Sequence, residues 1–139
     1  MSPRRRQGGQ ALVEFSLAII VFLMLLMAVF DFGRGIYMYN GVSQAAREIA
    51  RRTSVYPGLA LGQSTQSQAV VAVQRGLVPG MSTPAYACLT ITGSVSTSNP
   101  CTSGDSVQVT VTATYVPISL LGFLGTIPLT ASSTVQIPG

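Results

Sequence analysis

The hydrophobic residues of this chain follow three different patterns. The first is a charge-free run of sixteen residues from Phe15 to Phe30, which three more apolar residues extend across Glu14. At ~1.5 Å per residue, about 20 helical residues cross the roughly 30 Å hydrocarbon core of a bilayer. We therefore predict a membrane-spanning helix near the N-terminus.

The second pattern has the period of an amphipathic helix. Residues recur on one side of a helix at spacings of three and four, and they are Ile36, Tyr39, Val42, Ala46, Ile49 and Thr53. Polar and charged residues cover the other faces, so we predict one long helix from about Gln10 to Ser54. Asn40-Gly41 marks a weak point or kink within it.

The third pattern follows the breaker Tyr56-Pro57-Gly58. A short helix is predicted from Thr65 to Arg75, capped by Ser64 or Thr65 and ended by Gly76. Apolar residues then alternate with Thr, Ser and Gln in three stretches, which is the period of strands with one apolar face. The apolar positions are Ala87, Leu89, Ile91 and Val95, then Val107, Val109, Val111, Ala113 and Tyr115, then Leu129, Ala131, Val135 and Ile137.

A small three-stranded antiparallel sheet, packed by its apolar face on the long helix, satisfies these patterns, so the expected fold class is α+β. The connection from Pro117 to Pro128 is apolar where loops are usually polar. Either this connection folds back to cap the core, or it forms a contact patch for a partner or membrane. The residues of that patch would be Leu120, Leu121, Phe123 and Leu124.

Composition limits the chemistry that the chain can perform. Of its 139 residues, 47% are hydrophobic and only 9% are charged, and it contains no His, no Trp and no Lys. Its four acids, Glu14, Asp31, Glu48 and Asp105, are widely spaced. Most acid–base, metal and Schiff-base chemistries therefore lack the necessary groups, and we expect neither enzyme activity nor a cofactor.

Positive charge is concentrated at the N-terminus. Three of the eight arginines stand at positions 4–6, and from Gln10 onward five arginines oppose four acids. A nucleic-acid partner is not expected, because binding needs a basic face on the folded domain. The positive-inside rule predicts that the N-terminus is cytoplasmic and that the residues after Asp31 lie outside.

Two cysteines, Cys88 and Cys101, lie in the outer part and bracket the first predicted strand and its turn. Because an outer compartment is oxidising in most cells, we expect a structural disulfide that closes a loop of about 14 residues. A metal site is a poor alternative, since the spacing is not Cys-x-x-Cys and no His could complete a zinc site.

Glu14 is unusual, because a carboxylate within an apolar run costs about 2.5–3.5 kcal/mol at a bilayer centre and less near the edge. In one interpretation it lies at the cytoplasmic headgroup level and reaches toward water or Arg6. In another, cleavage after Gly9 makes Glu14 the fifth residue of a mature chain that begins at Gln10. The basic leader, the glycine, four residues and Glu14-Phe15 before a membrane helix resemble the signal of type IV prepilins.

The prepilin resemblance implies a mechanism. A membrane aspartyl peptidase removes the leader of such proteins on the cytoplasmic side, which would leave a new α-amine on Gln10. When helices bundle, the Glu14 carboxylate can neutralise an amine, usually that of a neighbouring subunit. The expected organisation is a leader over residues 1–9, a transmembrane and assembly helix over 10–56 and an outer α+β domain over 57–139.

Several longer segments resemble the TadE-like family of pilin-related proteins: GQALVEF at 9–15, DFGR at 31–34, YN at 39–40 and AAREIAR at 45–51. Members belong to tight-adherence (Flp-type) pilus systems, are processed as prepilins and act as minor pilins or pseudopilins. The resemblance assigns Gly9 and Gln10 to cleavage, and Glu14 with Phe15 to processing and assembly. It also marks, without a role, the positions of Asp31, Arg34, Arg47 and Arg51.

The resulting hypothesis is a pilin-like structural protein of tight-adherence pilus assembly and surface attachment. Expected partners are prepilin peptidase, other pilin or pseudopilin subunits, inner-membrane pilus assembly proteins and the membrane. The protein would be single-pass in the cytoplasmic membrane, then periplasmic or extracellular on the pilus. Two alternatives stay open: a major pilin that forms the filament itself, or a signal-anchored monomeric binding domain. Glu14 distinguishes a pilin from a signal-anchored domain, because a membrane anchor has no use for a carboxylate at this position.

Overall fold

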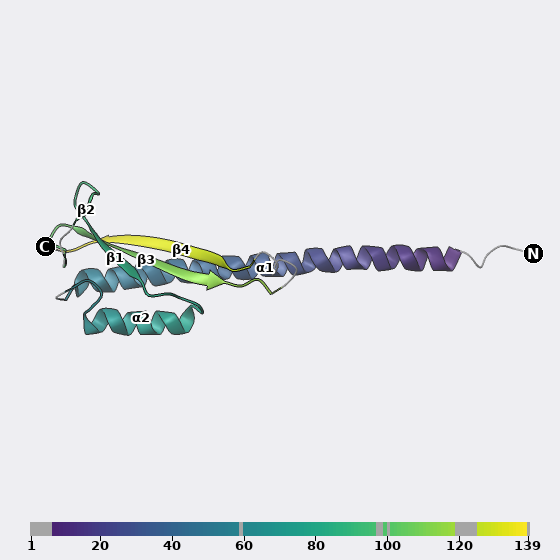
Figure 1. Ribbon diagram of the computed structural model, residues 1–139, viewed down its shortest axis with the longest axis horizontal. Helices are drawn as coiled ribbons and strands as arrows, with labels where there is room; N and C mark the ends of the chain where they lie inside the picture. The colour runs from purple at the N-terminus through teal and green to yellow at the C-terminus, as the bar shows by residue number, and fades with distance from the viewer. Residues whose placement is uncertain (1–6, 59, 97–98, 100, 119–124, 139) are drawn as a thin grey trace, which may run out of the picture.

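One long helix organises the molecule. The computed structural model describes residues 7–58, 60–96, 99, 101–118 and 125–138. Helix α1 (Gln7–Val55) runs along almost the whole length of the molecule, as Figure 1 shows. Its N-terminal half extends away from the other elements, whereas a second helix and a sheet pack along its C-terminal half. The apolar half of α1 is therefore uncovered, and the amphipathic half forms part of a folded core.

The core-facing side of α1 is lined by small and β-branched residues. Buried on this side are Val42, Ala45, Ala46, Ile49, Ala50 and Thr53. The predicted face is thus confirmed from Val42 onward, but Ile36 and Tyr39 remain 47% and 50% exposed. The helix is unbroken at Asn40-Gly41. A Cβ on Gly41 would lie 3.5 Å from Val78, which is an ordinary van der Waals distance.

Helix α2 (Thr65–Leu77) begins where the sequence predicted. Ser64 is its N-cap, and its Oγ accepts a hydrogen bond from the backbone N–H of Ser67 at 3.2 Å. Such a cap satisfies one of the otherwise unpaired N–H groups of the first turn. The Ser67 hydroxyl also lies 3.3 Å from that of Thr53, so a buried hydroxyl contact joins α2 to α1.

The sheet has four antiparallel strands in the order β2-β1-β3-β4. They are β1 (Ala85–Leu89), β2 (Val95–Ser96), β3 (Ser106–Tyr115) and β4 (Ile127–Gln136). The register of β3 with β4 is continuous from Ser106 opposite Gln136 to Tyr115 opposite Ile127. The predicted apolar face of β3 is confirmed, since every second residue from Val107 to Tyr115 is buried.

The prediction of three strands missed β2. The stretch read as one strand from Ala87 to Val95 is broken by a turn, in which the Gly93 N–H donates to the Thr90 carbonyl at 2.8 Å. Gly93 has a φ of +81°, a left-handed conformation that glycine adopts without a Cβ penalty. Ile91 lies in this turn and is 85% exposed, so its apolar character does not mark a core position.

The inward face of β1 was also predicted wrongly. Cys88 is 2% exposed and stands opposite the fully buried Val107, so Cys88 and Tyr86 face the core rather than Ala87 and Leu89. The cystine and the tyrosine ring supply the apolar surface on that side, which a count of aliphatic residues overlooks. Of the predicted apolar connection, Leu120, Leu121, Phe123 and Leu124 lie outside the described residues.

Candidate assembly helix and its junction with the outer domain

The N-terminal half of α1 is apolar on all sides. It is long and apolar enough to cross a membrane, and none of its most apolar 18-residue window is buried in the molecule. Phe15, Phe22 and Phe30 are 68%, 56% and 68% exposed. Exposed apolar area costs about 25 cal/mol per Å² in water, so this half requires lipid or other apolar helices around it.

The predicted processing residues lie at the start of this helix. Gly9 and Gln10 belong to the first turn of α1, and Glu14 follows one turn after Gln10 on the same face. A Cβ on Gly9 would meet no atom within 4 Å, so the fold does not require a glycine there. Glu14 is exposed, and no described residue forms a hydrogen bond or ion pair with its carboxylate.

Asp31 joins α1 to the end of β3. The Tyr115 hydroxyl donates a hydrogen bond to the Asp31 carbonyl at 2.9 Å, and the Ile118 N–H donates to Asp31 Oδ1 at 3.3 Å. Asp31 is only 7% exposed. Asp31 is therefore not solvated, because β3 and the residues after it cover the carboxylate.

Arg34 and Gly35 complete this junction from the helix side. The Arg34 guanidinium carbon lies 5.4 Å from the centre of the Tyr115 ring, a cation–π geometry. A Cβ on Gly35 would lie 3.9 Å from the same ring, an ordinary van der Waals distance, so the ring lies next to this residue. Burial raises the pKa of the Tyr115 phenol above its ordinary value, the Asp31 carboxylate raises it further, and Arg34 opposes both.

Next to this junction, α1 and the sheet enclose an apolar groove of about 350 Å³. We call it the junction groove. The residues that line it are Asp31, Phe32, Gly35, Ile36, Tyr39, Tyr115, Pro117, Ile127 and Leu129. Phe32, Ile36 and Tyr39 are spaced four and three residues apart, so they occupy one face of α1. Ile36 and Tyr39, the two exposed positions of the predicted amphipathic face, thus form part of the wall of this groove.

A charged cluster lies on the outer face of α1 further along. Glu48 accepts two hydrogen bonds from Arg51, at 2.8 and 3.1 Å, and one from Arg52 at 3.1 Å. Glu48 therefore forms ion pairs with both Arg51 and Arg52. Hydrogen bonds from Arg51 are the main cause that lowers the pKa of Glu48, with Arg52 adding to it against the effect of burial. Arg47, another of the family-motif positions, is exposed.

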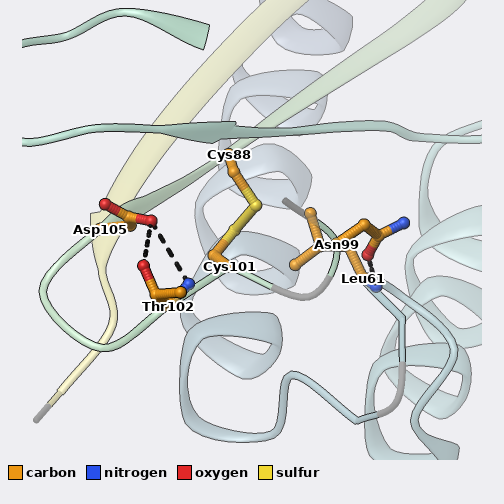
Figure 2. The surroundings of a disulfide bond; sticks show 6 residues. All are labelled: Leu61, Cys88, Asn99, Cys101, Thr102 and Asp105. Carbon is orange, nitrogen blue, oxygen red and sulfur yellow. Dashed lines mark hydrogen bonds between the residues drawn. A yellow bond between two sulfur atoms is a disulfide. The ribbon is translucent and has the colours of Figure 1, made fainter. Parts of the chain in front are cut away.

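Cys88 and Cys101 are joined by a disulfide, as the sequence suggested (Figure 2). Their Cα atoms lie 5.5 Å apart and both residues are buried. Nearby, the Asn99 side-chain oxygen accepts a hydrogen bond from the Leu61 N–H at 2.9 Å, which ties the loop before α2 to the bridged segment. Among the described residues, no group of three or more His, Cys, Asp or Glu residues that could hold a metal comes together.

Fold and geometry together define a class of protein. It is a small α+β domain built on the C-terminal half of a long helix, and the N-terminal half of that helix is apolar and uncovered. Comparison with known families adds a match over the helical part of the chain. Residues 9–51 match the model of the family described as TadE-like protein, so the predicted TadE-like resemblance is confirmed for the segment that carries the motifs. No curated protein and no solved structure matches the chain.

The match supports a protein associated with the tight-adherence pilus, a system whose TadE-like members are structural. Among the described residues, one helix, near the N-terminus, is long and apolar enough to cross a membrane, which fits a protein that crosses a membrane once. Three residues of the junction, Tyr115, Ile118 and Gly35, were missed by sequence reasoning. Tyr115 appeared only as the last apolar position of a strand, and nothing in its local pattern pointed to Asp31, which lies 84 positions away.

Proposed function

We propose that this protein is a minor pilin or pseudopilin of a tight-adherence pilus, inserted through α1 and trimmed after Gly9. The observation that carries the proposal is the coincidence of the TadE-like match at residues 9–51 with a helix whose apolar half is wholly uncovered. The chain would insert with its N-terminus in the cytoplasm and enter the pilus after processing.

In this proposal α1 serves two successive environments. It spans the cytoplasmic membrane first, and then packs against the helices of other pilin or pseudopilin subunits. Glu14 is costly in lipid but useful in a helix bundle, where its carboxylate can neutralise the α-amine of Gln10 on a neighbouring subunit. Its exposed position on α1 makes it accessible to such a neighbour.

Intact-mass measurement of membrane-extracted protein tests the processing step. We expect a mature chain that has lost residues 1–9 and retains 130 of the 139 residues. Gly9→Leu should block this loss, because the peptidase must accommodate a backbone without a side chain there. Gly33→Leu is the matched control, since a Cβ on Gly33 also meets no atom within 4 Å and it lies far from the cleavage site. Full-length parent protein in cells with active prepilin peptidase would contradict the proposal.

Substitution of Glu14 tests the assembly step. Glu14→Leu makes α1 more apolar, so insertion should persist, but assembly should fail because the amine of Gln10 is left without its carboxylate, at a cost of several kcal/mol. Glu14→Gln removes only the charge and should fail in the same assay. Ser16→Leu is the control, because the Ser16 hydroxyl only binds the Val13 carbonyl of its own helix at 2.9 Å.

The readouts are membrane level, co-purification with pilus components and surface attachment. A pilin should keep its membrane level in both Glu14 variants and lose the other two properties. A signal-anchored monomeric domain, the rival function, should behave like the parent in all three assays. Normal attachment by a processed, stable Glu14→Leu variant would therefore refute the assembly role.

A further inference from the structure

We propose that the junction groove is filled by phospholipid of the membrane that α1 crosses, so that the lipid-covered surface extends past Asp31 to Ile36. This proposal rests on the membrane insertion within the proposed function, and adds where the bilayer ends and which surface of the outer domain contacts it. The evidence lies in the burial of Asp31, the length of the apolar surface and the position of Arg34.

The first step concerns the charge on Asp31. By sequence, the apolar run ends at this residue, because a carboxylate in hydrocarbon is costly. In the structure its Oδ1 accepts a hydrogen bond from the Ile118 N–H, and only 7% of the residue is exposed. Asp31 lines the junction groove, but its carboxylate is hydrogen-bonded and almost covered, so lipid in the groove meets little of it. The apolar surface continues instead through Phe32, which is 71% exposed.

The second step concerns length. From Phe15 to Phe30 the run has sixteen residues, or about 24 Å of helix, which is short of the roughly 30 Å hydrocarbon core. After Glu14, the next charged residue that is exposed on α1 is Arg34. The segment between these two charges has nineteen residues, or about 28 Å, which matches the core. The bilayer boundary is then set by Arg34 rather than by Asp31.

The third step places the groove. With the boundary at Arg34, Ile36 lies about 3 Å and Tyr39 about 7.5 Å further out along α1, which is the depth of the headgroup region. Tyrosine is enriched in that region, because its ring is apolar and its hydroxyl polar. The Arg34 guanidinium stands at the level of lipid phosphates. The groove is continuous with the lipid-facing surface of α1 at Phe32, and this continuity favours a lipid occupant over a second copy of the chain.

The chain contains no Trp, so single Trp substitutions provide an unambiguous fluorescent probe. Full-length Ile36→Trp would be reconstituted into phosphatidylcholine vesicles whose acyl chains carry bromine near the headgroup end. Leu23→Trp, within the apolar run, reports insertion. Val73→Trp is the aqueous control, because Val73 is 59% exposed on α2 and lies outside the groove.

We expect the fluorescence of Leu23→Trp to be quenched, because this residue lies inside the bilayer. Ile36→Trp should show at least about half of that fractional quenching, because it lies at the headgroup level, and Val73→Trp should show none, because it lies in water. Phe32→Trp, an aromatic exchange at an exposed site, repeats the measurement should Ile36→Trp fold poorly. If Ile36→Trp and Phe32→Trp were unquenched while Leu23→Trp was quenched, the lipid in the junction groove would be refuted and the membrane insertion of α1 would stand. If their emission then depended on protein concentration, a second copy would be the occupant. Absence of quenching in Leu23→Trp would overturn the membrane insertion as well.

Discussion

Replacing Tyr115 by Phe removes one hydrogen bond from the junction between α1 and β3. The phenol donates to the Asp31 carbonyl at 2.9 Å, and Tyr115 is 5% exposed. A buried hydrogen bond contributes about 0.5–1.5 kcal/mol net. The Asp31 carbonyl lies inside α1, where it can accept a helical hydrogen bond, and the Phe ring can still stack on Arg34. The free energy of unfolding should therefore fall by only about 0.5–1 kcal/mol, the lower part of that range.

The effect should depend on pH in a defined direction. Burial and the Asp31 carboxylate raise the pKa of Tyr115 above its ordinary value of about 10, so the folded state favours the protonated phenol. This stabilisation is complete below the pKa of the unfolded chain and is lost as the pH rises through the pKa of the folded protein. The parent should therefore lose stability in alkaline solution faster than Tyr115→Phe, and the difference between them should shrink.

Chemical denaturation of the detergent-solubilised full chain at several pH values measures both effects. Hydrogen exchange at the Ile118 amide adds a local readout, because this N–H donates to Asp31. Tyr37→Phe is the matched control, since Tyr37 is 78% exposed on α1 and should show no change at neutral pH. Equal stability of Tyr115→Phe and the parent at neutral pH, with the same alkaline slope, would refute the account of the junction.

Three further predictions concern the outer part of the molecule. Reduction of the disulfide should lower the free energy of unfolding by about 3 kcal/mol in the chain-entropy model, and thiols that titrate in fresh, non-reduced protein would contradict it. Gly62→Ala should destabilise by about 1–3 kcal/mol, because its φ is +73° and its Cβ would lie 2.5 Å from the Tyr86 ring; unchanged thermal stability would count against this packing. Glu48→Gln should cost a few tenths of a kcal/mol at neutral pH. Since the pKa of Glu48 is lowered, its contribution is present above the unfolded pKa and lost as the pH falls through the folded pKa, so acid titration should abolish the difference.

Periodic elements were predictable from sequence because one physical pattern controls each of them. The long helix was predicted from about Gln10 to Ser54 and is observed from Gln7 to Val55. In β3, alternate burial follows directly from alternate apolar residues, since strand side chains point to opposite faces. The Ser64 cap of α2 was likewise readable, because a hydroxyl before a helical pattern has a direct partner in the first turn.

Other features depend on contacts between distant residues and could not be read from local pattern. The inward face of β1 is set by the cystine of Cys88 and by Tyr86, whose ring packs against Gly62. Aliphatic alternation therefore indicated the opposite face. Asp31 was recognised as a family-motif position, but its burial depends on Tyr115, which lies on a strand far along the chain. A charge that ends an apolar run is normally solvated, and only tertiary structure reveals that this one is covered.

The junction at Asp31 gives the proposed assembly step a mechanical consequence. Helix α1 is unbroken between Glu14 and Asp31, and these residues lie about 26 Å apart along its axis. Because hydrogen bonds from Tyr115 and Ile118 hold Asp31 to the end of the sheet, the outer domain has a defined position on the helix at that point. A neighbouring subunit that pairs with Glu14 thus fixes the height of the outer domain as well as that of the helix. Weakening the junction should loosen the outer domain and leave pairing at Glu14 intact. The two carboxylates on α1 would then have separate roles: Glu14 pairs with a neighbouring subunit, and the buried Asp31 holds the outer domain to the helix.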